Sequence, residues 1–305
     1  MAKVNICVCV KNRQRFLETV FHSLVTQTYE DLKILGCDGI SQDDTMSELF
    51  YMQQGTRGKI VAWHTEEEGY VNTHNFILSK IDPDCEYVGF VESDDLVDEN
   101  KVKYQVEYLE AHPEVDVVSS CVVFSDKKIL INTYMELNDD QITKGLKKGI
   151  PMSTICHFPS CIFRRKVLEK FINGKYFYDE YDNGMCGEGF LYTLHFLGYK
   201  FANIPTTIYL YRRGLDPNSM SNTMVPEFAN LINMQEYDMK KTAIMELFDK
   251  YNGKPIKKTA TKKKVEKKEE DENPKVEVLD EVKVEEPVVE EAPKKKRGRP
   301  KKTQE

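Results

Sequence analysis

The chain has 305 residues, 40% of them hydrophobic, which suffices for one sizeable core or two modest ones. Its net charge of −7 argues against a broad nucleic-acid-binding surface on the folded part, and no apolar run approaches the roughly 18 residues of a membrane span. The eight scattered cysteines lack the paired spacing of zinc sites, and the chain opens without a signal-peptide pattern, so we expect buried thiols in a reducing cytoplasm.

Apolar runs alternate with helical patterns along the chain, which is typical of an α/β domain built from β-α-β units. In chain order, the predicted elements are strand 4–10, helix 15–27, strands 31–39 and 58–64, helix 69–81, strand 86–93, helix 98–112 and strand 115–124. An amphipathic helix, a glycine and a further strand are predicted between residues 190 and 205.

Acidic side chains follow two of these strands: Asp38 comes after the second, and Glu92, Asp94 and Asp95 come after "YVGFV". Ligands of open α/β sheets bind beyond the carboxyl ends of the strands. Clustered carboxylates raise one another's pKa unless a cation neutralises them, and oxygen ligands suit Mg²⁺ or Mn²⁺, which reach for phosphates. The pattern indicates a metal that holds a diphosphate, with a solvated turn or a helix N-cap as the alternative.

Several motifs stand in the order and spacing of a known family. They are Asn12 and Arg13, the Gln27-Thr28-Tyr29 run, Asp38-Gly39 with Ser41, Asp43 and Thr45, then Asn75, and finally the segment from Glu92 to Asp95. Over roughly residues 3–222 the chain thereby resembles the family 2 glycosyltransferases with the GT-A fold. The resemblance implies a central, mostly parallel mixed sheet flanked by helices. It implies a GT-A domain over residues 1–225, followed by a helix packing on that domain within 226–252.

The resemblance also implies roles for single residues. Val10, Asn12 and Asp38 would line the pocket for the base and ribose of a nucleotide-sugar donor. Asp94 would ligate a divalent cation, Mn²⁺ or Mg²⁺, that bridges the donor's diphosphate. Glu92 stands where the family usually has the shorter Asp, so it would contact the metal, a metal-bound water or the ribose. Further donor-binding positions are expected at Arg13, Asn75, Ser93 and Arg212, with Arg213 as an alternative to Arg212 and a solvated surface role as the competing interpretation of both.

Catalysis would need a base that takes the proton from the acceptor hydroxyl. The family places it in a pair of acids that begins a helix, where Glu188 matches the first acid and Gly189 falls where the second belongs. Three alternatives follow: Glu188 is the base, Asp182 or Asp179 is the base, or the enzyme is impaired. Asp95, near the donor sugar or the metal, completes the expected catalytic set. An acid at a helix start also stabilises the helix dipole, which is the structural alternative for Glu188.

One histidine on an apolar stretch, His157, is left out of the catalytic set. The family tends to use this stretch around the acceptor, but a lone histidine there is more often a packed one.

The final segment, residues 253–305, differs from the rest because it contains no aromatic residue. It carries 17 of the 43 basic and 13 of the 50 acidic residues, so its net charge is +4 and that of the preceding chain is −11. This composition predicts disorder. Within it, Arg297, Gly298, Arg299 and Pro300 resemble an AT-hook core, which lies in a narrow A·T minor groove. A nuclear-import-like basic cluster and a plain solubilising tail are the alternatives.

Three functions therefore stay open. The first is metal-dependent transfer of a sugar from a nucleotide-diphosphate donor, with inversion, to a glycan, glycolipid or protein. The second is transfer to DNA bases by an enzyme that its tail tethers to DNA. The third is a catalytically silent nucleotide-sugar or DNA-binding module, an alternative that stays open because Gly189 stands where the family has an acid.

Overall fold

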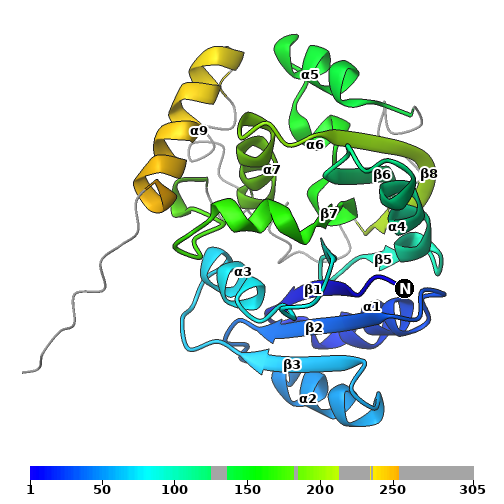
Figure 1. Ribbon diagram of the computed structural model, residues 1–305. Helices are drawn as coiled ribbons and strands as arrows, with labels where there is room; N and C mark the ends of the chain where they lie inside the picture. The colour runs from blue at the N-terminus through cyan, green and yellow to red at the C-terminus, as the bar shows by residue number, and fades with distance from the viewer. Residues whose placement is uncertain (125–135, 182–184, 213–233, 235, 254–305) are drawn as a thin grey trace, which may run out of the picture. The chain divides into compact units, whose positions relative to one another are not determined.

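The computed structural model describes residues 1–124, 136–181, 185–212, 234 and 236–253. Within these residues, helices flank one mixed sheet of eight strands in the order β3-β2-β1-β4-β7-β6-β8-β5 (Figure 1). The strands are β1 (Val4–Val10), β2 (Leu32–Asp38), β3 (Ile60–His64), β4 (Tyr87–Phe90), β5 (Leu96–Val97), β6 (Val117–Phe124), β7 (Ile162–Arg164) and β8 (Phe201–Tyr211).

The sheet is mostly parallel. Strands β3, β2, β1 and β4 are parallel neighbours, β7 runs antiparallel to both β4 and β6, and β8 is parallel to β6. The short β5 pairs antiparallel with the end of β8. This arrangement confirms the predicted α/β fold.

The α-helices are α1 (Gln14–Val25), α2 (Thr45–Gly55), α3 (Tyr70–Leu78), α4 (Lys101–Ala111), α5 (Asp139–Lys147), α6 (Met152–Ile155), α7 (Cys186–Phe196) and α9 (Tyr237–Asn252). The described part of the chain also contains three short 3₁₀ helices, η1 (Phe158–Ser160), η2 (Arg165–Lys170) and η3 (Asp179–Tyr181). Among the described residues, no helix is both long and apolar enough to cross a membrane.

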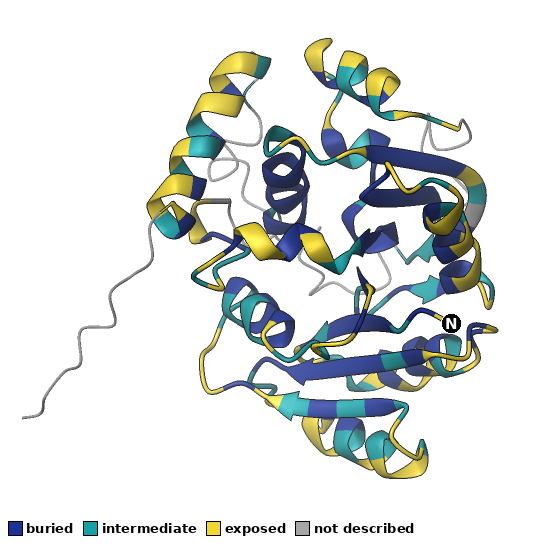
Figure 2. Ribbon diagram, viewed as in Figure 1, coloured by how far each residue is buried: buried dark blue, intermediate teal, exposed yellow. Residues whose placement is uncertain are grey.

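The sheet has a hydrophobic cluster on each face, because successive side chains of a strand point to opposite sides. Ile6 and Val8 of β1 belong to the cluster that α1 and α4 cover, whereas Cys7 belongs to the cluster that α3 and α7 cover. Figure 2 shows the strands and α7 as mostly buried, while α2 and α9 expose their outer faces. Burial on both faces explains why the strands appear in the sequence as nearly continuous apolar runs.

The fold differs from the predicted elements in several places. No element was predicted at β5, β7, α5 or α6, and two further differences concern α2 and β4. Helix α2 follows β2 although no helix was predicted there, because it buries only Thr45 and Leu49 and so has a weak apolar periodicity. The strand predicted over 86–93 ends at Phe90, since the backbone N–H of Glu92 leaves the ladder and donates to the Tyr209 hydroxyl. Residues 92–95 therefore form a turn beyond the carboxyl end of β4.

Helix α9 lies in the segment where a C-terminal helix was expected. It packs against α7: Lys240 Nζ donates to the Tyr192 hydroxyl at 3.1 Å, and Ile244 and Phe248 join the cluster that contains α7. Asp182, Arg213 and the AT-hook-like residues 297–300 lie outside the described residues.

Candidate functional site

Several predicted site residues meet at the carboxyl ends of the parallel strands. Val10 at the end of β1 is paired with Asp38 at the end of β2, and Asp38 in turn is paired with His64 at the end of β3. The turn 92–95 follows β4, which is the other neighbour of β1. The strand order changes direction at β1, and such a switch point forms the ligand-binding crevice of open α/β sheets.

Glu92 is held by two tyrosines that the sequence analysis did not identify. Its Oε1 accepts a hydrogen bond from the Tyr70 hydroxyl of α3 at 2.8 Å, and its backbone N–H donates to Tyr209 of β8 at 3.2 Å. Burial raises the pKa of Glu92 to about 7, while the Tyr70 hydrogen bond acts to lower it and Asp94 to raise it. A bound cation would favour the charged form of this carboxyl.

Asp94 lies between two arginines. Arg13 Nε is 3.9 Å from Asp94 Oδ2, and Arg212 Nε donates to the Asp94 backbone oxygen. Arg212 also packs over the ring of Phe16, 4.9 Å from its centroid, and donates to Thr19 Oγ1 at 3.2 Å. The predicted donor-binding residues Arg13, Asp94 and Arg212 therefore lie together, and Arg212 also contacts α1.

Asp95 is buried and uses both carboxylate oxygens within the fold. Tyr209 donates to Oδ2 at 2.7 Å, and the backbone N–H of Arg212 donates to Oδ1 at 2.8 Å. Burial raises the pKa of Asp95 well above its usual range, and Asp94 adds to that effect. The residue ties the turn 92–95 to β8, and the neighbouring Ser93 is buried as well.

The carboxylates of Glu92 and Asp94 fit a divalent cation that is also coordinated by a bound ligand. Among the described residues, no group of three or more His, Cys, Asp or Glu side chains is arranged as a metal cage. Glu92 and Asp94 supply two carboxylates at the same turn. Mg²⁺ usually binds through one or two carboxylates together with waters and substrate phosphates, and Mn²⁺ shares its preference for oxygen ligands. The two carboxylates match that pattern, in which a diphosphate supplies further oxygens.

Hydrogen bonds join the turn after β1 to the turn after β2. The Asn12 backbone N–H donates to Ser41 Oγ at 2.9 Å, while Asn12 Oδ1 accepts the Gln42 N–H at 2.7 Å. Asn12 has φ 53° and Ile40 has φ 65°, so both adopt the left-handed conformation. A β-branched residue such as Ile40 rarely adopts it. Strained residues of this kind persist where the surrounding contacts enforce them, often at binding sites.

Asp38 is covered rather than open. Ser41 Oγ donates to its Oδ1 at 2.5 Å, the Ser41 N–H donates to Oδ2 at 3.1 Å, and His64 Nδ1 lies 3.2 Å from Oδ2. Only 1% of the Asp38 side chain is exposed, against 41% for His64. His64 was not among the predicted site residues, and no spacing in the sequence points to it.

The amide of Asn75 is engaged elsewhere in the fold. Its Oδ1 accepts the N–H groups of Tyr176 and Phe177 at 2.7 and 2.9 Å, and its Nδ2 donates to the Phe177 oxygen at 2.9 Å. Asn75 thus joins α3 to the segment that precedes α7. Because these hydrogen bonds lie within the protein, Asn75 positions α3 against residues 176–177.

Glu188 lies in the first turn of α7 and is buried. Its Oε1 accepts the Ser153 N–H of α6 at 3.3 Å. Burial raises the pKa of Glu188, whereas the Ser153 hydrogen bond and the charge of Lys240 act to lower it. Cys186, at the beginning of α7, belongs to the hydrophobic cluster against which Tyr70 and Cys9 pack.

Two other residues considered in the sequence have different environments. Asp179 is exposed on η3 and forms an ion pair with Lys175 at 3.4 Å. His157 packs edge-on against the rings of Tyr209 and Tyr211, with centroid distances of 5.7 and 5.6 Å, and burial lowers its pKa to about 4. His157 is therefore a packed histidine, as expected.

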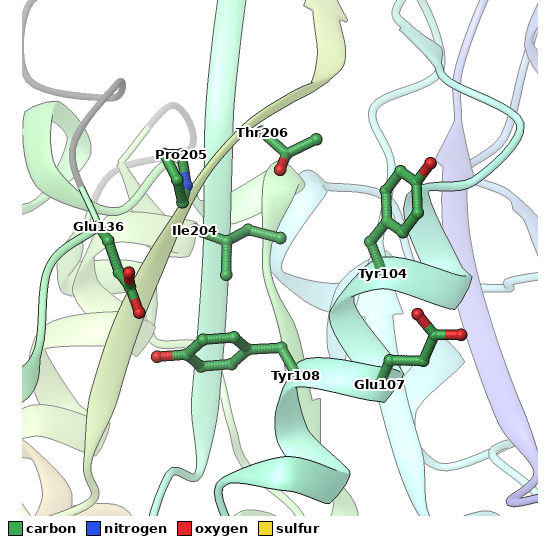
Figure 3. Close-up of a pocket in the computed structure, with 7 residues that line it drawn as sticks. All are labelled: Tyr104, Glu107, Tyr108, Glu136, Ile204, Pro205 and Thr206. Atoms are coloured by element: carbon green, nitrogen blue, oxygen red, sulfur yellow. The ribbon is translucent and has the colours of Figure 1, made fainter.

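A separate open pocket of about 320 Å³ lies between α4 and the middle of β8 (Figure 3). Its lining comprises Tyr104, Glu107, Tyr108, Glu136, Ile204, Pro205 and Thr206. The pocket contains none of the predicted site residues and does not lie at the carboxyl ends of β1 to β4. This pocket is therefore distinct from the candidate site at the turn 92–95.

Residues 5–172 match the family model described as "Glycosyl transferase family 2", and the chain belongs to this family. An uncharacterized glycosyltransferase of Rickettsia bellii (strain RML369-C) is 27% identical over 109 residues, which is 36% of this chain and 15% of that protein. Another from Haemophilus influenzae (strain ATCC 51907 / DSM 11121 / KW20 / Rd) is 26% identical over 118 residues, 38% of this chain and 36% of that protein. The match thus spans well under half of either relative.

Solved structures resemble this fold along most of the chain. S. aureus TarS 1-349 in complex with UDP-GlcNAc has a TM-score of 0.60 at 16% identity, covering 81% of this chain and 71% of that one. The mannosyltransferase PcManGT from Pyrobaculum calidifontis, in complex with GDP-Man and Mn²⁺, has a TM-score of 0.53 at 17% identity, covering 80% and 74%. These likenesses confirm the predicted GT-A fold.

Proposed function

We propose that the protein is a glycosyltransferase that moves a sugar from a nucleoside-diphosphate donor to an acceptor hydroxyl, with the help of Mn²⁺ or Mg²⁺. The observation that carries this proposal is the combination of Glu92 and Asp94 with Arg13 and Arg212 at the end of β4. Two carboxylates suit a divalent cation, and two guanidinium groups suit the phosphates of a nucleoside diphosphate. Family membership and neighbours solved with UDP-GlcNAc or with GDP-Man and Mn²⁺ support it.

The chain's own groups divide the work in this proposal. The bound cation would stabilise the negative charge that develops on the leaving diphosphate. Glu92 and Asp94 would hold that cation, and Arg13 would supply a further positive charge next to Asp94. Asp95 acts through Tyr209 and the backbone of Arg212, which set the shape of the turn.

Glu188 is the proposed base on the acceptor side. Its pKa is raised by burial, so the carboxylate is a stronger proton acceptor than an exposed one. Attack by the acceptor on the face opposite the leaving group inverts the anomeric carbon. The acceptor in this proposal is a glycan, a glycolipid or a protein, and the location is the cytoplasm.

The test measures release of nucleoside diphosphate from a panel of nucleotide sugars in the presence of Mn²⁺. We expect Asp94→Ala to lower turnover by about a hundredfold or more, since a group that stabilises developing charge contributes roughly that factor. Asp84→Ala is the matched control, because Asp84 is exposed and pairs with Lys3, which precedes β1 and so lies at the end of that strand opposite the site. Chelation of the metal should abolish turnover, and added Mn²⁺ should restore it.

Other outcomes select the alternatives. Binding of nucleotide sugars without turnover, for any acceptor, would support the silent module that Gly189 suggests. A gain in mass of plain or hydroxymethylated DNA would support transfer to DNA bases. Turnover that persists in Asp94→Ala, or that needs no divalent cation, would contradict the proposal.

A further inference from the structure

Helix α9 contacts α7 through a buried lysine. Lys240 Nζ donates to the Tyr192 hydroxyl at 3.1 Å and lies 4.3 Å from the centroid of the same ring. Only 8% of Lys240 is exposed. Figure 1 shows α9 beside α7, and both helices follow residue 172, where the match to the family model ends. The contact therefore belongs to a part of the chain that the family model does not cover.

Helix geometry by itself does not favour a lysine at this position. Lys240 is the fourth residue of α9, and the positive end of the helix dipole lies at that end of the helix. Burial adds a second cost, because it removes the ammonium from water and lowers the pKa of Lys240. A buried ammonium here therefore needs a partner of opposite charge.

The carboxylate of Glu188 is that partner. Glu188 and Tyr192 are four residues apart on α7, so they share one face of the helix. They accept hydrogen bonds from consecutive residues of α6: the Ser153 N–H donates to Glu188 Oε1 at 3.3 Å, and the Met152 N–H donates to the Tyr192 hydroxyl at 3.2 Å. The two acceptor oxygens thus lie side by side at the beginning of α6. Lys240 binds one of them, and its charge acts to lower the pKa of the other group, the Glu188 carboxyl.

The other titratable groups of α7 and of the elements packed against it are engaged elsewhere or uncharged. Helix α6 has no titratable residue. The groups are the ion pairs Asp179–Lys175 and Glu180–Lys250 of η3, the His195–Tyr237 contact between α7 and α9, His157 before η1, whose pKa burial lowers to about 4, and the buried Cys186 thiol. Lys240 is therefore the cation that we assign to Glu188.

We propose that Lys240 is a positioning residue for Glu188: together with Tyr192 it holds the carboxylate and supplies the positive charge that favours its ionised form. The inference rests on the proposed function, because it takes Glu188 as the base. It makes removal of the acceptor proton depend on the C-terminal helix α9.

The test is the pH dependence of kcat/KM for nucleotide-sugar turnover by the full chain with Mn²⁺. A base must be ionised to accept a proton, so turnover falls on the acid side of its pKa. Loss of a neighbouring positive charge raises the pKa of a carboxyl, which moves this acid limb to higher pH. We expect Lys240→Met and Lys240→Gln to shift the limb upward by about one pH unit, with KM for the donor unchanged. Lys240→Gln keeps an N–H donor to Tyr192, so it separates the charge from the hydrogen bond.

Two further variants serve as controls. Lys240→Arg retains the charge and should keep the acid limb at the wild-type pH. Lys241→Met replaces the exposed neighbouring lysine of α9 and should change neither the limb nor KM. Circular dichroism establishes that each variant is folded, and Lys240→Gln serves if Lys240→Met is not.

A second measurement does not depend on turnover. Carboxyl NMR titration of glutamate-labelled protein gives the pKa of Glu188 directly, with Glu188→Gln to assign its signal. The pKa should be higher in Lys240→Gln than in the wild type. Glu188→Gln itself should lower turnover by about a hundredfold or more, as expected for removal of a general base.

The outcomes separate this inference from the proposed function. An acid limb or a Glu188 pKa that is the same in Lys240→Gln and the wild type would overturn the role of Lys240, as would an equal shift in Lys241→Met. Wild-type turnover in Glu188→Gln would also overturn it, and in each case the glycosyltransferase proposal would stand. If the wild type turns over no nucleotide sugar, both proposals fail.

Discussion

Lys101, at the first position of α4, is a fully buried cation outside the candidate site. Its Nζ donates to Gln105 Oε1 at 2.7 Å, and Gln105 Nε2 donates to the backbone oxygens of Val118 and Ser160. Burial lowers the pKa of Lys101 to about 7. Between that value and the ordinary value of 10.5, the unfolded chain binds a proton that the folded chain does not, so this residue makes stability rise with pH.

Replacing this lysine gives a prediction with a definite sign. Lys101→Met should raise the free energy of unfolding by about 2 kcal/mol at pH 6, where the buried ammonium destabilises the fold in full. The gain should shrink as the pH rises from 7 towards 10.5, because the wild-type lysine is then neutral in the folded state. Denaturant unfolding at pH 6, 8 and 10 measures it. A gain that is the same at all three values would show that packing, and not charge, is responsible.

At the scale of elements, α7 approaches η1 so closely that a glycine is required between them. A Cβ on Gly187 would lie 2.4 Å from a ring carbon of Phe158, whereas a Cβ on Gly55, at the end of α2, would meet nothing within 4 Å. The contact places the first turn of α7, with Glu188, against the segment that carries His157. The position of the proposed base thus depends on helix packing.

The two glycines provide a matched pair of variants. Gly187→Ala should destabilise the fold by about 1–3 kcal/mol, because the methyl group overpacks the interface with Phe158. Gly55→Ala should stabilise it by about 0.5 kcal/mol, since alanine restricts the unfolded chain and fits the helix. Thermal unfolding of both variants provides the comparison. Equal effects of the two changes would contradict the role assigned to the α7–η1 contact.

At the scale of the whole molecule, the chain divides into Met1–Lys257 and Lys258–Glu305. All residues of the candidate site belong to the first unit. The acidic and basic charges are unevenly shared between the two parts, with the basic excess in residues 253–305. A contribution of the second unit to DNA binding would therefore be electrostatic and sensitive to salt.

Removing residues 258–305 tests that contribution. We expect nucleotide-sugar turnover and the melting temperature to stay at the wild-type level, because the site and the described core lie before residue 258. Retention on A·T-rich DNA at low salt should weaken, and the loss should disappear as salt is raised. Gel-shift titrations at two salt concentrations measure it. Retention that is unchanged by the truncation would dismiss the AT-hook interpretation of residues 297–300.

Local patterns predicted much of the fold and part of the site. Nearly continuous apolar runs identified six of the eight strands of the described sheet, whereas the short β5 and β7 were not predicted. Acids at the ends of β2 and β4 placed Asp38 and Asp94 at the carboxyl ends of the strands. Helix α2 was missed because its apolar face is narrow. His64, Tyr70 and Tyr209 were missed because nothing in their sequence neighbourhood distinguishes them from ordinary core or surface residues.

The sequence by itself determined the fold class and the family, because both depend on patterns along the chain: the alternation of strands and helices, and motifs in a characteristic order. Only the tertiary structure decided how each carboxylate is used, because hydrogen-bond partners are brought together by the sheet and not by spacing. Tyr70 is 22 residues from Glu92, His64 is 26 from Asp38, and Tyr209 is 114 from Asp95. The tyrosine contacts act on the pKa values of Glu92 and Asp95, and Asp38 is covered while His64 stays exposed. These contacts determine the chemistry available at the carboxyl ends of the strands.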